Sequence, residues 1–182
     1  MDNKNYEKII SQIDLPFSET NDKFLPAIFE ILENNFGLKK DSKQSFIDLG
    51  SGNGQVMVFS ALNYRIKTTG IEIDSNLIKE AKKTIYEFKK KKKFDKKMFR
   101  KIKVIHGNFY THNLKNYDFI YIFSLPNMQK YLKHVFKTTK RGAIIISYKY
   151  PLNNVGEFIH LKTKLEHRIE NQEVSTYFYQ RI

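Results

Sequence analysis

The sequence contains no cysteine, and this absence narrows the chemistry open to it. Disulfides, thiolate zinc sites and cysteine nucleophiles are excluded, and a cytoplasmic location is the expectation. No apolar run is long enough to span a bilayer and no signal-peptide pattern is present, so we expect no membrane contact. The five histidines show no metal-ligand spacing, and no Ser-His-Asp or paired-carboxylate pattern stands out. We therefore predict no metal site.

Acidic residues are scarce relative to basic ones, 19 against 32, which gives a formal net charge of +13. Such an excess favours an anionic partner, with nucleic acid as the first candidate. The segment 89–103 holds ten Lys or Arg residues and a single acid, Asp95. Two interpretations stay open for residues 89–101 of this segment. They form either a solvated basic helix end with its loop, or a contact with nucleic acid or with a nucleic-acid-bound substrate.

The 182 residues suffice for a single domain with a buried core, spanning 1–182. Residues 1–37 are expected to form a helical cap that ends at Gly37, and another helix is expected over 127–138. Strand patterns alternate with helical ones, and the last two resemble an antiparallel pair. This order predicts an α/β fold: a Rossmann-like, mostly parallel seven-stranded sheet with helices on both faces and a C-terminal antiparallel hairpin. The expected strands are 46–49, a second strand that ends within 69–74, and strands at 102–105, 117–124, 143–148, 158–168 and 174–181.

The stretch from Phe46 to Gly54, Phe-Ile-Asp-Leu-Gly-Ser-Gly-Asn-Gly, carries the strongest functional signal. Apolar residues around Asp48 are typical of a strand buried in a parallel sheet. Glycines follow at positions 50, 52 and 54, and an amphipathic run comes next. The pattern therefore predicts a strand, a tight glycine turn and a helix, with backbone open to close approach by a ligand.

The spacing of this turn indicates which ligand it binds. Dinucleotide enzymes use Gly-x-Gly-x-x-Gly, whereas position 55 here is Gln. Asp48 would repel a pyrophosphate and attract an ammonium group. Glu72, near the tip of the next expected strand, is placed to accept hydrogen bonds from two ribose hydroxyls. An amine, a ribose and no phosphate describe S-adenosylmethionine (AdoMet); the alternative is a Rossmann-like sheet without a ligand.

Two further residues are expected at the carboxyl ends of the strands, where ligands bind in such sheets. The side-chain amide of Asn108 can pair with the edge of adenine, and the ring of Phe109 can pack on its face. Asn108 also suits an ordinary turn, so both interpretations of it remain open.

The glycine turn, Asp48 and Glu72 together resemble motifs I and II of the class I (seven-β-strand) AdoMet-dependent methyltransferases. The order of segments 16–20 (PFSET), 48–56 (DLGSGNGQV) and 70–72 (GIE) is similar to the non-SET protein-lysine methyltransferases. This group includes the disruptor-of-telomeric-silencing histone enzymes and small archaeal and mitochondrial relatives. The similarity covers roughly residues 15–150.

The resemblance implies transfer of a methyl group from AdoMet to the side-chain amine of protein lysine, with S-adenosyl-L-homocysteine as product. It places Ser124, Leu125, Pro126 and Tyr177 on the acceptor side, where Phe123 and Tyr179 are also candidates for an aromatic channel. The cofactor-binding set that it implies is Glu19, Thr20 and Gln55 at the methionine end, Glu72 at the ribose, Asn108 and Phe109 at the adenine, with Asp48, Gly50, Ser51, Gly52, Gly54 and Phe123.

This sequence departs from the family in two places. Asn108 replaces an acidic adenine contact, and the histone enzymes' Asn-Asn-Phe is replaced by residues 123–126. The main alternative is an rRNA, tRNA or DNA methyltransferase. The motif of these enzymes at the end of the fourth strand includes a stacking aromatic residue, which Ser124-Leu-Pro-Asn127 lacks. A small-molecule N-methyltransferase and a non-enzymatic basic binding module are further alternatives. The expected partners are protein lysines, some on nucleic-acid-associated proteins, and the expected oligomeric state is a monomer.

Overall fold

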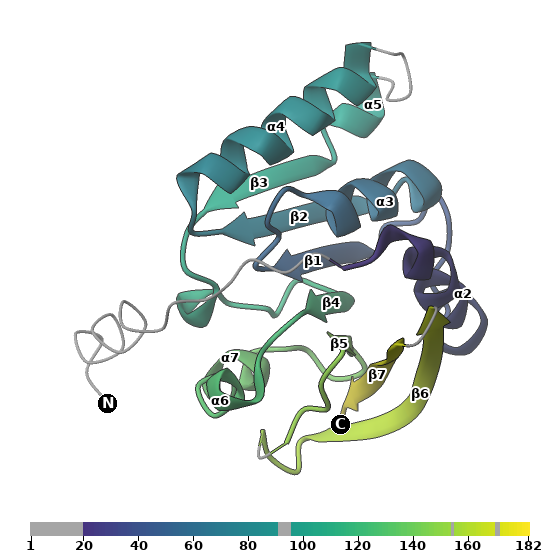
Figure 1. Ribbon diagram of the computed structural model, residues 1–182, viewed down its shortest axis with the longest axis vertical. Coiled ribbons are helices and arrows are strands. Elements are labelled where there is room, and N and C mark those ends of the chain that lie inside the picture. The colour runs from purple at the N-terminus through teal and green to yellow at the C-terminus, as the bar shows by residue number, and fades with distance from the viewer. Residues whose placement is uncertain (1–19, 91–95, 154, 170–171) are drawn as a thin grey trace.

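A seven-stranded sheet forms the centre of the computed structural model, which describes residues 20–90, 96–153, 155–169 and 172–182 (Figure 1). The strand order is β3-β2-β1-β4-β5-β7-β6. Strands β1 to β5 pair in parallel, and β7 runs antiparallel to both β5 and β6. The predicted fold class is confirmed. The strands are β1 (Ser45–Leu49), β2 (Lys67–Glu72), β3 (Ile102–His106), β4 (Phe119–Ile122), β5 (Ile144–Tyr148), β6 (Ile159–Ile169) and β7 (Gln172–Arg181).

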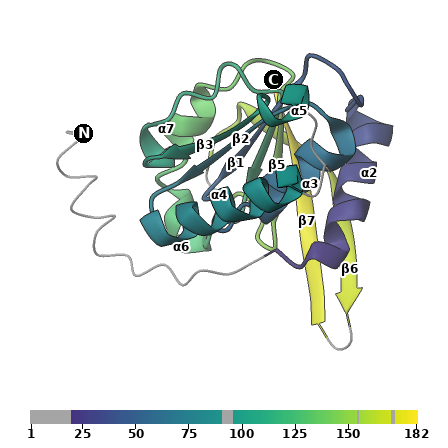
Figure 2. The same cartoon turned by 90° about the horizontal axis from the view of Figure 1, so that it is seen from above.

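Helices cover both faces of the sheet, as Figure 2 shows. Helices α2 and α3 lie on one face, and α4 and α5 pack beside α3 through a smaller cluster. Helices α6 and α7 lie on the other face. Because side chains alternate along each strand, the core is split into a cluster on each side. The helices are α2 (Leu25–Phe36), α3 (Gln55–Tyr64), α4 (Ser75–Lys90), α5 (Lys96–Phe99), α6 (Pro126–Gln129) and α7 (Lys133–Lys137), with 3-10 turns η1 (Asp22–Phe24) and η2 (Phe109–Thr111).

The described part of the N-terminal cap begins and ends at the residues that the sequence predicts. Asn21 caps η1 with its side chain, and α2 ends at Gly37, whose φ of 69° is the left-handed conformation that glycine adopts freely. Residues 1–19, which include the first expected helix and Glu19, lie outside the described residues. No helix among those described is long and apolar enough to cross a membrane.

Two expected elements differ from the structure. The single helix expected over 127–138 is wrong: α6 and α7 are separate, and bonds from Tyr131 N–H to Met128 O and from Leu132 N–H to Gln129 O tighten the backbone between them. Gln129 is buried there and its amide bonds to the 151–153 segment, a tertiary tie that no local pattern reveals. The strand expected over 117–124 is shorter, because β4 runs out of its pairing with β1 at Ile122.

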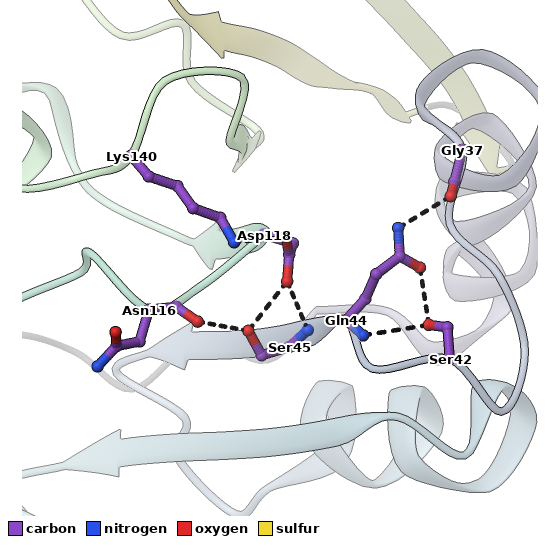
Figure 3. A network of polar contacts seen from close by, with 7 residues as sticks. All are labelled: Gly37, Ser42, Gln44, Ser45, Asn116, Asp118 and Lys140. Carbon is purple, nitrogen blue, oxygen red and sulfur yellow. Dashed lines mark hydrogen bonds and ion pairs between the residues drawn. The ribbon is translucent and has the colours of Figure 1, made fainter.

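A polar network fixes the amino end of β1 (Figure 3). The Ser45 N–H donates to Asp118 Oδ2 at 2.8 Å, and the Ser45 hydroxyl donates to Asn116 O at 2.6 Å. Lys140 Nζ lies 2.6 Å from the other Asp118 oxygen. The side chain of Gln44 donates to Gly37 O and accepts from Ser42, so the cap and the first strand are joined. The side chains of Gln44, Ser45 and Asp118 at this end of β1 are therefore all hydrogen-bonded.

Candidate functional site

The glycine turn between β1 and α3 has the geometry that the sequence predicts. Gly50, Gly52 and Gly54 have φ values of 78°, 53° and 84°, all in the left-handed region that other residues rarely adopt. The N–H groups of Gly50 and Ser51 both donate to Ile71 O, at 2.9 and 3.0 Å. The turn is therefore tied to the neighbouring strand β2.

Small residues around the turn let it pack tightly. A side chain at Gly54 would meet Ala81 of α4 at 3.0 Å. A side chain at Gly70 of β2 would overlap Met57 and come within 2.7 Å of Ser51 Oγ. Gly70 was expected within the second motif but was given no role from sequence. Its function is to leave room for the turn and for the start of α3.

Glu72 stands at the end of β2 and braces this turn. Its Oε2 accepts the Gly52 N–H at 2.8 Å, and its Oε1 accepts the N–H groups of Ile73 and Asp74 at 2.7 and 2.9 Å. The side chain is buried, with a relative exposure of 8%. The predicted ribose-binding residue is thus fixed in position and joined to the glycine turn.

Asp48 shares a face of the sheet with Glu72. It pairs in register with Gly70 on β2, two residues before Glu72, and with Tyr121 on β4. Its exposure is 3%. Burial raises the pKa of Asp48 to about 8, and the nearby Glu72 charge contributes in the same direction. Asp48 and Glu72 thus lie close together, no ion pair found among the described residues includes either of them, and a positively charged ligand would stabilise the ionised form of Asp48.

Thr20 is linked to the surroundings of Asp48 through Tyr121. Its hydroxyl is 2.7 Å from the Tyr121 hydroxyl, and Tyr121 is the β4 neighbour of Asp48. Burial raises the pKa of Tyr121 well above its ordinary value, against the Thr20 hydrogen bond, and the Asp48 charge raises it further. Gln55 begins α3 at the end of the turn and is half-buried. The structure thus brings Thr20 beside Tyr121, its contact with the methionine end of AdoMet stays a prediction, and Glu19 lies outside the described residues.

The expected adenine residues flank the other side of the turn. A side chain at Gly50 would lie 3.6 Å from the Phe109 ring, so this ring stands beside the glycine backbone. Phe109 also packs on Tyr110, with ring centroids 4.4 Å apart. The Asn108 side chain accepts the Tyr110 N–H at 2.9 Å and caps η2. Asn108 thus has a turn-forming role, whereas the adenine role stays a prediction.

The expected acceptor residues are only partly brought together. Ser124 is buried two residues after the end of β4, and its Oγ has no hydrogen-bond partner among the described residues. Leu125 caps α6 and Pro126 begins it, exposed. Phe123 packs against the cluster under α2, whereas Tyr177 packs against the cluster on the opposite face. Tyr179 is a core residue whose hydroxyl accepts the Leu152 N–H.

A row of four aromatic residues runs outward from Asp48. Tyr121 stacks on Tyr148 with centroids 6.4 Å apart, Tyr148 meets Phe123 edge-on at 5.6 Å, and Phe123 stacks on Tyr150 at 6.0 Å. The first two are buried and the last two are half-buried. Sequence reasoning included Phe123 and missed the other three. The alternation of aromatics at 119, 121 and 123 was a signal for one shared face.

These residues fit AdoMet. The glycine turn lies beside the Phe109 ring, the fixed carboxylate of Glu72 suits a ribose, and buried Asp48 is in no ion pair found among the described residues. Ser51 Oγ and Ser124 Oγ are buried without a partner in the part of the chain that the structure describes. The described residues contain no group of three or more His, Cys, Asp or Glu that could hold a metal.

Comparisons with known proteins agree with this geometry. A family model described as the ANTKMT methyltransferase domain matches residues 48–157. An RNA methyltransferase from Salinibacter ruber, crystallised with S-adenosyl-L-homocysteine, is 18% identical, with a TM-score of 0.66 over 92% of this chain and 94% of that chain. Magnesium protoporphyrin IX methyltransferase from Synechocystis, solved with bound AdoMet, is 11% identical, with a TM-score of 0.69 over 91% and 86%.

The m1A22 tRNA methyltransferase of B. subtilis is a third similar structure. It is 13% identical, with a TM-score of 0.65 over 90% of this chain and 68% of that chain. At these identities the solved structures establish the fold. No curated protein matches the sequence significantly.

Proposed function

The chain belongs to the ANTKMT methyltransferase domain family, and on that premise we propose that this AdoMet-dependent methyltransferase modifies the side-chain amine of protein lysine residues. The observation that carries the proposal is the aromatic row from Tyr121 to Tyr150, which begins beside Asp48 and ends half-buried. A long aliphatic stem that ends in an ammonium is chemically suited to such a row, because aromatic faces attract cations.

The cofactor would be held by residues already gathered at the strand ends. The backbone of the glycine turn would approach it closely, Glu72 would accept from the ribose, and Phe109 would pack on the adenine. Asp48 would face its ammonium, with Thr20 nearby. When bound, AdoMet supplies an electrophilic methyl group on a sulfonium sulfur.

The protein's own task is to position the acceptor and make its nitrogen a nucleophile. The acceptor nitrogen must lie about 3 Å from the methyl group, in line with the leaving sulfur. A lysine ammonium must also release a proton to water before its lone pair can attack. Tyr121 and Tyr148 are buried, and an environment of this kind lowers the pKa of an ammonium by desolvating it. With Asp48 facing the ammonium of the cofactor, the inner end of the row would therefore favour the reactive, neutral amine.

Nucleic acid is the second candidate acceptor. The net charge of +13 favours it, and an RNA and a tRNA methyltransferase are among the proteins of similar fold. Methylation of a base requires a stacking surface for the unpaired base. Position 127, after Pro126, is an exposed Asn in α6 rather than an aromatic residue. We therefore place protein lysine first, with targets that include nucleic-acid-associated proteins.

Labelling with methyl-labelled AdoMet separates these acceptors. The enzyme is incubated with a mixed protein and RNA extract, and the products are digested in parallel with protease and with ribonuclease. We expect the label on lysine, released by protease and absent when Glu72→Ala replaces the wild-type enzyme. Label that survives protease and disappears with ribonuclease would replace lysine with RNA as the acceptor.

A further inference from the structure

Lys149 occupies an unusual backbone position directly after β5. Its φ is 69°, the left-handed conformation that non-glycine residues adopt at a cost. Its N–H donates to Ser175 O at 2.8 Å, and the next N–H, that of Tyr150, donates to Tyr148 O at 2.9 Å. The Ser147 hydroxyl donates to Tyr150 O at 2.7 Å. Three hydrogen bonds therefore hold this turn in a fixed place.

The ammonium of Lys149 lies over the outer end of the aromatic row. Its Nζ is 6.0 Å from the centroid of the Phe123 ring and 5.6 Å from that of Tyr150. The two rings stack at an interplanar angle of 16°. No ion pair found among the described residues includes Lys149. Both distances are within the range of cation–π attraction, so these rings already attract one lysine side chain.

Resting on the proposed function, we propose that Phe123 and Tyr150 bind the ammonium of the acceptor lysine, and that Lys149 holds this place in the free protein. The two side chains have the same aliphatic stem and the same charge, so they compete for the same rings. A site that its own chain partly occupies binds an external ligand with reduced apparent affinity. Lys149 thus limits access to weakly binding acceptors.

The two ends of the aromatic row differ in burial, and this difference suits the charged and the neutral form of the acceptor amine in turn. Phe123 and Tyr150 are half-buried and suit a charged ammonium, whereas Tyr148 and Tyr121 are buried and disfavour charge. An acceptor would be recognised as a cation at the outer pair and would lose its proton further in.

Steady-state kinetics test the competition, with the acetylated peptide amide Gly-Gly-Lys-Gly-Gly as acceptor. Lys149→Met should lower the KM for the peptide about twofold to fivefold, and Phe123→Leu or Tyr150→Leu should raise it by a similar factor. Lys149→Arg keeps the cation and should stay near wild type. Lys137→Met removes an exposed charge on α7 and is the matched control. The AdoMet Kd of Lys149→Met, Tyr150→Leu and Lys137→Met, measured by calorimetry, should not change.

A second readout does not depend on turnover. In protein labelled with 13C-lysine, the ε-methylene signal of Lys149, identified by its loss in Lys149→Arg, should be shifted upfield by the two rings. The lysine peptide should return it toward the random-coil position, and the same peptide with norleucine should not.

The two readouts distinguish failure of this inference from failure of the proposed function. Displacement of Lys149 by a peptide that is never methylated would support the inference and count against lysine as the acceptor. Methylation without displacement, with an unchanged KM in Lys149→Met, would overturn the inference and leave the proposed function standing. An ε-methylene signal at its random-coil position in the free protein would also overturn it.

Discussion

The two ends of strand β1 differ in whether their buried polar side chains have hydrogen-bonding and ion-pair partners. At the amino end, Ser45 makes three hydrogen bonds to Asn116 and Asp118, and Asp118 is paired with Lys140 (Figure 3). At the carboxyl end, Asp48 is buried beside Glu72 and its pKa is raised to about 8. Both ends contain a carboxylate close to a serine-bearing segment. Of the two carboxylates, only Asp118 at the amino end is in an ion pair found among the described residues.

This difference separates structural polar groups from binding ones. A buried charge is stable when paired, and burial without a partner costs free energy. The amino end has the paired arrangement and serves the fold. In the part of the chain that the structure describes, the carboxyl end retains a buried carboxyl group, Asp48, that is in no ion pair, and two buried hydroxyls, on Ser51 and Ser124, that have no hydrogen-bond partner. We interpret the free-energy cost of burying these groups without partners as evidence for a binding site, in which a cationic ligand supplies the missing partners.

The largest expected effect comes from the packing of the glycine turn. Gly70→Ala adds a methyl group where Met57 and Ser51 already stand, so we expect about 3 kcal/mol of destabilisation. AdoMet binding should weaken by at least tenfold, because the turn must shift. Urea unfolding and calorimetry measure the two effects.

Gly107→Ala provides the matched control for that substitution. Its new methyl group would meet nothing closer than 3.7 Å, and Gly107 has no positive φ. Stability should therefore change by less than about 1 kcal/mol. Equal losses in the two variants would show that the tight approach at Gly70 is not special.

The amino end should respond in stability without a response in binding. Asp118→Ala removes the acceptor of the two Ser45 hydrogen bonds and the partner of Lys140, so we expect a loss of about 2 kcal/mol. The AdoMet Kd of the folded variant should equal that of wild type. A tenfold change in Kd would contradict the separation of the two ends.

The carboxyl end should show a pH dependence that comes from Asp48. Its folded pKa of about 8 lies above its ordinary value of 3.8, so the folded state binds more protons than the unfolded state between these limits. The contribution of Asp48 to stability therefore falls as pH rises from about 4 through 8, by up to about 1.4 kcal/mol per pH unit. Thermal unfolding from pH 5 to 9 should show this slope in wild type and a smaller one in Asp48→Asn. Parallel curves would exclude Asp48 as its source.

The smallest effect on the site is expected from the lysine-rich segment. Its residues 96–101 directly precede β3 and so lie at the amino ends of the strands, away from Glu72. Lys101 Nζ donates to Arg65 O, and Lys89 Nζ lies 4.4 Å from the Phe99 centroid, so these two cations have local roles. Replacing Lys96, Lys97 and Arg100 by Gln should leave the AdoMet Kd unchanged.

The same triple variant tests the proposed contact with nucleic acid. The salt dependence of RNA binding, measured by fluorescence anisotropy, should become less steep. An unchanged slope would identify this part of the segment as a solvated surface.

Local signals account for what the sequence could predict. The glycine turn, the Gly37 cap and the closing hairpin depend on residues near one another in the chain, and the structure confirms all three. The end of β4 and the break between α6 and α7 depend on tertiary pairing, by Ile122 and Gln129.

The candidate site also contains residues that local spacing predicts and residues that only strand pairing brings together. Asp48 and Glu72 were predicted from their spacing to the turn, and the structure places them on one face. The aromatic row was largely missed, because Tyr121 and Tyr148 meet only when β4 and β5 pair. No pattern in the sequence predicts that Lys149 would lie over two of its rings.

Calorimetric titration of the wild type and of Glu72→Ala with AdoMet, and separately with NAD, tests the central claim most directly. The claim is that the carboxyl ends of β1 and β2 bind a cationic, phosphate-free adenosine ligand. We expect saturable AdoMet binding to wild type, weakened by at least about 1–3 kcal/mol in Glu72→Ala, because ribose hydroxyls would lose their charged acceptor. NAD should give no saturable heat. Binding of NAD in place of AdoMet, or an unchanged AdoMet Kd in the folded variant, would contradict the account.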